Sequence, residues 1–147
     1  MSGSSGVGGD GVERYSSGGS WEDTFGYSRA VAAGDFVLVS GCTAAVDGVV
    51  LHEGDPFRQT QAAFGVVADA LKHFGLGLAD VVRTRMYIAH SGDADEVGRA
   101  HAELFGAIRP AATMVVVDSL IDSRMLVEVE ADAYRGAGRG ANRGKDA

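Results

Sequence analysis

Two stretches near the end of the chain decide its fold: RPAATMVVV at residues 109–117 and LVEVEADA at residues 126–133. The first is rich in β-branched residues, which is typical of a strand that is covered on both faces. The second alternates strictly, so its apolar side chains share one face of a strand and its carboxylates share the other. The acidic face consists of Glu128, Glu130 and Asp132, and both a solvated surface and a functional site remain open as interpretations.

The rest of the chain supplies further strands and two helices. Apolar runs bounded by Gly, Ser and Asp predict strands at residues 27–32, 36–41, 42–46, 49–51 and 82–88. Apolar residues that recur every three or four positions predict helices at residues 55–74 and 93–108. The first helix has a clear beginning at Asp55-Pro56 and a clear end at Gly75, which suits a left-handed cap.

Two of these strands carry finer expectations. Residues 36–41 form a continuous hydrophobic run, which predicts burial on both sides, and the run ends at Ser40-Gly41, where the backbone could approach a ligand. Residues 82–88 alternate, so Val82 is expected on the core face and Tyr87 on the opposite face.

The order of the elements predicts an α+β domain, with two helices packed on one face of a mixed sheet. The other face of the sheet is left uncovered. Because an open sheet face with apolar residues must be buried, we expect it to pack against copies of the same chain.

The length of 147 residues suits one domain. Residues 1–20 are mostly Gly and Ser, and residues 136–147 are Gly-rich, so both ends are expected to be disordered. The folded domain is therefore expected to span residues 21–135.

Composition excludes several classes of protein. The net charge of −7 disfavours a nucleic-acid partner, and no apolar run is long enough to predict a membrane span. A single cysteine, Cys42, excludes an internal disulfide and points to the cytoplasm. The four histidines lack the spacing of metal ligands, so neither a metal nor a cofactor is expected, and His101 falls on an apolar helix stripe as a core residue would.

From about residue 25 to residue 134 the chain resembles the Rid proteins, also called the YjgF/YER057c/UK114 family. The resemblance rests on FVLVSG at residues 36–41, Asp55-Pro56 with Gln59 and Gln61, VVRTRMYI at residues 81–88, and the two stretches quoted first. It implies a fold similar to chorismate mutase of the bacillus type. It also implies a homotrimer whose three sheets line an inner barrel, with clefts for small-molecule substrates between subunits.

In deaminase members of that family the cleft holds a tyrosine before the first strand, a Ser-Gly pair after the second and a glutamate in the last strand. The matching residues here are Tyr27, Ser40-Gly41 and Glu128. The resemblance therefore implies catalytic roles for Tyr27, Ser40 and Glu128. Substrate contacts are expected at Gly41, Tyr87, Ala112 and Met114.

The chain departs from the family pattern at one important position. Where active members read Pro-Ala-Arg, this chain has Pro110-Ala111-Ala112, and Ala112 lacks the guanidinium fork that binds a carboxylate. Arg29, Arg109 and Arg124 are candidate substitutes, although a surface role suits each of them better.

Three functions follow from the resemblance. The first is hydrolysis of an imine, enamine or related reactive molecule, with a substrate other than the usual 2-aminoacrylate-derived imine. The second is a non-catalytic trimer that binds a small molecule or acts like a chaperone, and the third and least favoured is an endoribonuclease. A nucleophilic role for Cys42 is also less favoured, because no histidine is identifiably paired with it.

Overall fold

The alternating stretch near the C-terminus forms β9 (Val127–Tyr134), which lies in the middle of the main sheet. It pairs antiparallel with β4 (Phe36–Cys42) on one side and with β7 (Val81–Ile88) on the other. In this computed structural model, which describes residues 4–136, the apolar side chains of β9 have no exposed surface; they are Val127, Val129, Ala131 and Ala133. The strict alternation of this strand is confirmed.

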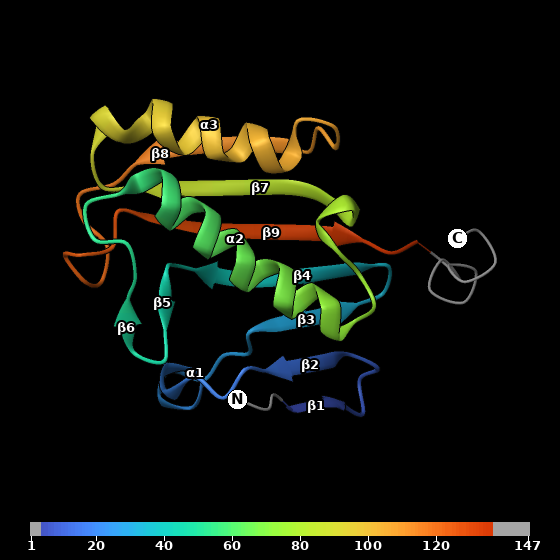
Figure 1. Cartoon of the computed structure of the whole chain (residues 1–147). Helices are drawn as coiled ribbons and strands as arrows, with labels where there is room; N and C mark the ends of the chain where they lie inside the picture. Colours follow the sequence, from blue (N-terminus) through green and yellow to red (C-terminus); the bar gives the residue numbers. More distant parts are fainter. Residues whose placement is uncertain (1–3, 137–147) are drawn as a thin grey trace.

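Seven strands make up this sheet, in the order β1-β2-β3-β4-β9-β7-β8 (Figure 1). The remaining strands are β1 (Ser4–Val7), β2 (Glu13–Ser16), β3 (Ala30–Ala33) and β8 (Ala111–Val116). Only β7 and β8 are parallel, and the others pair antiparallel. The predicted mixed sheet of an α+β fold is confirmed.

A small hairpin stands apart from the main sheet. It consists of β5 (Ala45–Val46) and β6 (Val49–Val50), joined by two residues with positive φ, Asp47 at 52° and Gly48 at 79°. Positive φ at both central positions is the requirement of a type I′ turn, which Asp-Gly satisfies readily.

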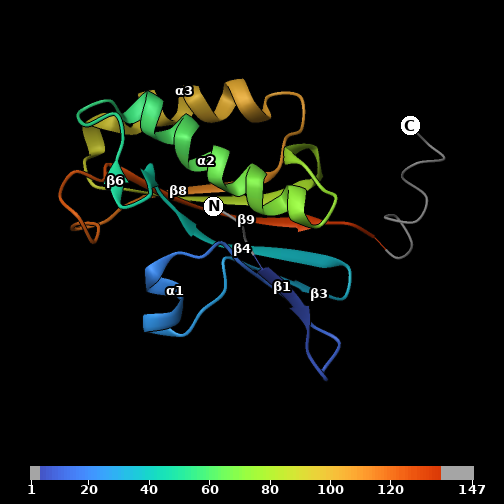
Figure 2. The same ribbon diagram turned by 60° about the horizontal axis from the view of Figure 1, so that its bottom comes forward.

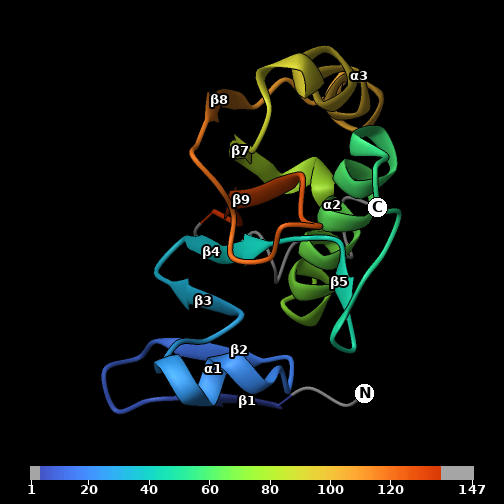
Figure 3. The same ribbon diagram turned by 90° about the vertical axis from the view of Figure 1, so that its left-hand side faces the viewer.

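Helices α2 (Pro56–His73) and α3 (Ala94–Phe105) cover the same face of the sheet (Figures 1 and 3). The Asp55 side chain caps α2 by accepting a hydrogen bond from the Arg58 backbone N–H at 3.0 Å, and Gly75 follows the helix with φ of 75°. Phe64 of α2 and Phe105 of α3 pack edge to face, with ring centroids 5.0 Å apart. A short 3₁₀ turn at Leu78–Asp80 precedes β7, and another at Ser91–Asp93 precedes α3.

The N-terminal region differs from the prediction. Residues 4–16, expected to be disordered, form the hairpin β1–β2, and α1 (Ser20–Phe25) lies on the side of the sheet opposite α2 and α3 (Figure 2). The Gly- and Ser-rich composition predicted disorder because it offers little apolar surface to bury. The hairpin is instead stabilised by backbone hydrogen bonds between β2 and β3. Tyr15 adds one anchor by stacking on His73 of α2, with centroids 4.3 Å apart. Residues 1–3 and the predicted tail at 137–147 lie outside the described residues.

One burial prediction was wrong. Val82 is 43% exposed and Val81 is buried, because the register between β7 and β9 shifts between Val81 and Arg83.

Residues 36–41 and 109–117 were expected to be covered on both faces. Within one chain each has exposed residues: Leu38 of β4 is 45% exposed on the open face, and Val116 of β8, an edge strand, is 54% exposed. Their burial against further copies of the chain stays a prediction.

One buried side chain ties distant segments together. The Gln59 amide has no exposed surface, and its nitrogen donates to the carbonyl oxygens of Leu51 at 3.1 Å and Arg124 at 2.9 Å. Its oxygen accepts a hydrogen bond from the Leu126 backbone N–H at 2.8 Å. Gln59 therefore fixes the segment that leads into β9.

Replacing this amide by an apolar group of similar size should destabilise the protein strongly. In Gln59→Leu the backbone groups of Leu51, Arg124 and Leu126 lose their partners, which should lower the free energy of unfolding by about 3 kcal/mol. Gln61→Leu is the matched control, because Gln61 lies on the exposed side of the same helix. Denaturant midpoints measured at one protein concentration check this, and equal midpoints for the two variants would contradict it.

Candidate functional site

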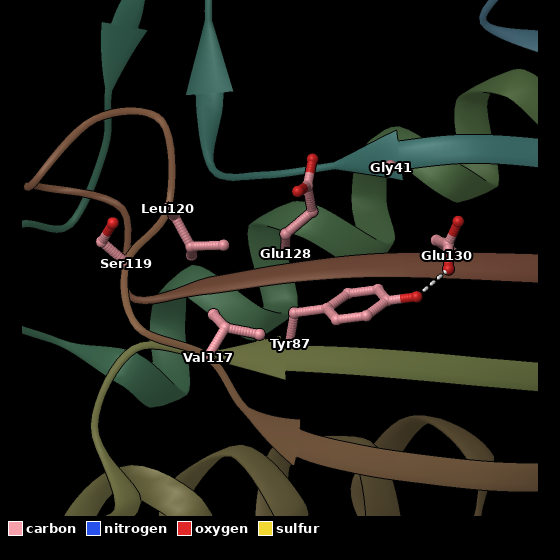
Figure 4. Close-up of a pocket in the computed structure, with 7 residues that line it drawn as sticks. All are labelled: Gly41, Tyr87, Val117, Ser119, Leu120, Glu128 and Glu130. Carbon is pink, nitrogen blue, oxygen red and sulfur yellow. Dashed lines mark hydrogen bonds between the residues drawn. The ribbon is translucent and has the colours of Figure 1, made fainter.

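A hollow of about 380 Å³ opens on the uncovered side of the sheet, where β4 and β7 end and β9 begins, near the β8–β9 loop (Figure 4). Its lining combines two carboxylates, a tyrosine and apolar side chains. The residues are Gly41, Tyr87, Val117, Ser119, Leu120, Glu128 and Glu130. Three residues expected to be functional, Gly41, Tyr87 and Glu128, thus share one hollow.

Glu128 differs from the other two acids on its face of β9. Glu130 accepts a hydrogen bond from the Tyr87 hydroxyl, and Asp132 pairs with Arg85 at 3.5 Å. Within residues 4–136, the Glu128 carboxylate takes part in no hydrogen bond or ion pair, although it is half-buried. Burial raises the pKa of this carboxyl, the Glu130 charge raises it further, and the Arg29 charge opposes both. Glu128 is therefore a candidate acid or base.

Gly41 provides the space for this carboxylate. A Cβ atom at position 41 would lie 2.6 Å from Oε2 of Glu128, closer than atoms can pack. The pairing of β4 with β9 is irregular between Val39 and Cys42, which places Gly41 at a local distortion of the sheet. Glycine is needed at position 41 because any side chain would displace the acid.

Tyr87 and Glu130 form a pair beside Glu128 (Figure 4). Their side chains meet because position 87 of β7 lies opposite position 128 of β9, and Glu130 follows on the same face. The hydrogen bond to Glu130 raises the pKa of the Tyr87 hydroxyl, so it remains a proton donor at neutral pH.

Arg29 lies behind this hollow and already has several partners. Its guanidinium donates to the Gly41 carbonyl at 2.6 Å, contacts the Cys42 sulfur at 3.4 Å, and lies 3.7 Å from the carboxylate of buried Glu22. A further contact of 3.5 Å joins it to the Tyr27 hydroxyl. Of the three candidate substitutes for the missing arginine, Arg29 is the one beside the hollow. Arg109 bonds to the Gly106 carbonyl, and Arg124 pairs with Asp122 and Glu53.

Cys42 is buried, and burial raises the pKa of its thiol to about 11. Its sulfur lies beside Arg29, yet desolvation outweighs that neighbour. A thiol in this state is protonated at neutral pH, so the structure favours a packing role over a nucleophilic one.

Tyr27 and Ser40 line a second, separate hollow of about 530 Å³ next to α1, together with Arg14 and Glu22. The Ser40 hydroxyl donates to the Ser28 carbonyl at 2.7 Å. Within one chain, these two residues are therefore not gathered around Glu128. Arg29 connects the two hollows, because it contacts Tyr27 on one side and Gly41 on the other.

Ala112 and Met114 lie further away, on edge strand β8. Met114 is paired in register with Met86 and packs against the core beneath the helices. Ala112 shares that side of the strand and pairs with Thr84, whose hydroxyl lies 2.8 Å from Nε2 of His101. His101 is thus a satisfied histidine at the edge of the core, as predicted, and neither β8 residue reaches the Glu128 hollow of its own chain.

Sequence reasoning missed three lining residues as site candidates: Val117, Ser119 and Leu120. The alternation of β9 placed Glu130 on the acidic face beside Glu128 without assigning it a role of its own. No comparable signal marks the β8–β9 loop, because loop conformation has no sequence period. Within residues 4–136, no three His, Cys, Asp or Glu side chains are grouped as metal ligands, and no helix has the length and hydrophobicity to cross a membrane.

Comparison with known proteins gives consistent matches. The family model described as endoribonuclease L-PSP matches residues 21–135. The uncharacterized protein SCO2049 of Streptomyces coelicolor is 55% identical over 126 residues, which cover 86% of this chain and 94% of that protein. The RutC family protein PH0854 of Pyrococcus horikoshii is 31% identical over 111 residues, covering 74% of this chain and 86% of that one.

A solved structure agrees with these matches. Rv2704 of Mycobacterium tuberculosis, a member of the YjgF/YER057c/UK114 family, is 45% identical and superposes with a TM-score of 0.75. The superposition covers 84% of this chain and 98% of Rv2704. Together with the fold and the family model, these matches show that the chain belongs to the YjgF/YER057c/UK114 family, also called the Rid family.

Proposed function

We propose that this protein hydrolyses the C=N bond of a small imine, or of an enamine that tautomerises to one, in the hollow beside Glu128. The supporting observation is the half-buried Glu128 carboxylate, which faces the hollow and has no partner within residues 4–136. A carboxylate with a raised pKa in a concave site is a common general base.

The reaction needs a water molecule and three proton transfers. Glu128 removes a proton from water as the oxygen attacks the carbon of the protonated imine, which gives a neutral carbinolamine. The same carboxyl then gives this proton to nitrogen. The C–N bond breaks as the carbinolamine hydroxyl loses its proton to the Glu128 carboxylate, so that a carbonyl compound and ammonia or an amine leave and the carboxyl then releases the proton to solvent. The Tyr87–Glu130 pair borders this space and offers a hydroxyl donor to the polar end of the substrate.

The complete cleft is proposed to lie between subunits of a cytoplasmic homotrimer. The uncovered sheet face exposes apolar side chains such as Phe36 and Leu38, which favours contact with further copies. In such an assembly, Tyr27, Ser40, Ala112 or Met114 of a neighbouring subunit would complete the cleft.

Two alternatives have less support. A non-catalytic binding protein is favoured only by Ala112, which removes a substrate anchor without affecting Glu128. RNA cleavage, which the description of the family model names, suits this chain poorly, because two carboxylates in the hollow and a net charge of −7 repel phosphates.

The first test removes the proposed base. Glu128→Gln keeps the shape of the side chain but not its basicity, so kcat for imine hydrolysis should fall about 100-fold or more. Glu103→Gln, on the exposed side of α3, is the control and should retain full activity. Trapping the remaining imine with semicarbazide measures the rate, and an active Glu128→Gln protein would refute the assignment.

The pH dependence supplies a second test. Activity should be present when Glu128 is ionised and should be lost as the pH falls through its raised pKa. Glu130→Gln removes the neighbouring negative charge and lowers that pKa, so the acid limb of the kcat profile should move to lower pH. Arg29→Gln removes the opposing positive charge and should move the limb to higher pH; shifts in the same direction would contradict this.

A third test uses the space above Gly41. Gly41→Ala should displace the Glu128 carboxylate and reduce kcat by about 10-fold or more. The free energy of unfolding should change by less than about 1 kcal/mol, because the displaced atoms end a flexible side chain. Gly65→Ala is the control, since a Cβ there meets no atom within 4 Å. Unchanged activity of Gly41→Ala would contradict the proposed fit.

A further inference from the structure

We propose that the substrate has no carboxylate: the hollow selects a neutral or protonated imine with an apolar chain, such as one formed by oxidation of a primary amine. This inference rests on the proposed imine hydrolysis and names the class of substrate. It follows from three features: the negative charge of the hollow, the partners that the nearest cation, Arg29, already has, and the apolar side chains in the lining.

The charge of the hollow is negative. Glu128 and Glu130 both line it, and no arginine or lysine within residues 4–136 does so. An anionic substrate would bring a third negative charge next to these two carboxylates, whereas a protonated imine would be attracted. The unpartnered Glu128 carboxylate is the group that gains most from such a cation.

The nearest cation, Arg29, already binds other groups of the protein. Arg29 is only 12% exposed at its side chain, with Glu22 at 3.7 Å and the Gly41 carbonyl at 2.6 Å. Binding a carboxylate bidentately requires two parallel N–H groups of one guanidinium to face the ligand. One terminal nitrogen of Arg29 already donates to Gly41 and Nε faces Glu22, so binding a ligand carboxylate in this way would compete with partners that Arg29 already has.

The remaining wall is mostly apolar, with Ser119 as its one polar side chain. Val117 and Leu120 come from the β8–β9 loop, and Leu120 extends toward Glu128 across the hollow (Figure 4). A ligand in the hollow therefore has an acid and a tyrosine at one end and aliphatic side chains at the other. This suits a C=N group attached to a short aliphatic chain.

The test compares two imines that differ only by a carboxylate. A flavin amine oxidase converts 3-methylbutylamine to 3-methylbutan-1-imine, and an amino acid oxidase converts leucine to the corresponding 2-imino acid. The full-length protein should accelerate hydrolysis of the amine-derived imine at least about 10-fold more than that of the imino acid. Semicarbazide trapping measures both reactions under the same conditions.

A charge placed in the hollow should reverse this preference. Leu120→Lys adds a cation to the lining, so the ratio of the two rates should shift toward the imino acid by about 10-fold or more. Ile121→Lys is the matched control: it adds the same charge one residue away, at a side chain that is 76% exposed and outside the lining. The ratio for Ile121→Lys should equal that of the unmodified protein.

The outcomes separate the two proposals. Faster hydrolysis of the imino acid than of the amine-derived imine by the unmodified protein would overturn this inference and leave imine hydrolysis standing. Equal shifts for Leu120→Lys and Ile121→Lys would also overturn it, because selectivity would then not arise in the hollow. Acceleration of neither imine would contradict the proposed function itself.

Discussion

The buried amide of Gln59 is the interaction on which the rest of the site depends. It joins the end of the small hairpin at Leu51 to the β8–β9 loop at Arg124 and to Leu126, immediately before β9. Directional hydrogen bonds from one side chain therefore set the relative positions of these segments. Because Glu128 follows two residues after Leu126, the same amide fixes the start of the strand that carries the candidate base.

The alternation of β9 places its apolar side chains and its acidic side chains on opposite faces of the sheet. Its apolar residues are completely buried on the side that α2 covers, while its acids face the open side. Glu130 and Asp132 are each stabilised by a partner on β7. Glu128 is partly buried, and within residues 4–136 its carboxylate has no hydrogen-bond or ion-pair partner. A partly buried carboxylate of this kind, on a strand whose other acids have partners, is typical of a functional site.

The sequence predicted the structure correctly where a pattern of neighbouring residues determines it. The alternation of β9, the Asp55-Pro56 start of α2 and the Asp-Gly turn all depend on neighbouring residues alone, and each was predicted correctly. The register shift at Val81 and the N-terminal hairpin depend on pairing with distant strands, which no local pattern encodes. Likewise, the position of Glu128 on the acidic face of β9 was predicted, but the neighbouring position of the loop residue Leu120 was not.

Arg29 is the cation nearest the hollow, and its partners limit what it contributes there. Its guanidinium is held by Glu22 and the Gly41 carbonyl, so Arg29 stabilises the backbone at Gly41 and opposes the rise in the pKa of Glu128. In the cleft proposed above, Ala112 of a neighbouring subunit would add no charge to offset Glu128 and Glu130. The lining that one chain contributes is therefore acidic, and under the proposed function this asymmetry favours substrates that bring a positive charge or none.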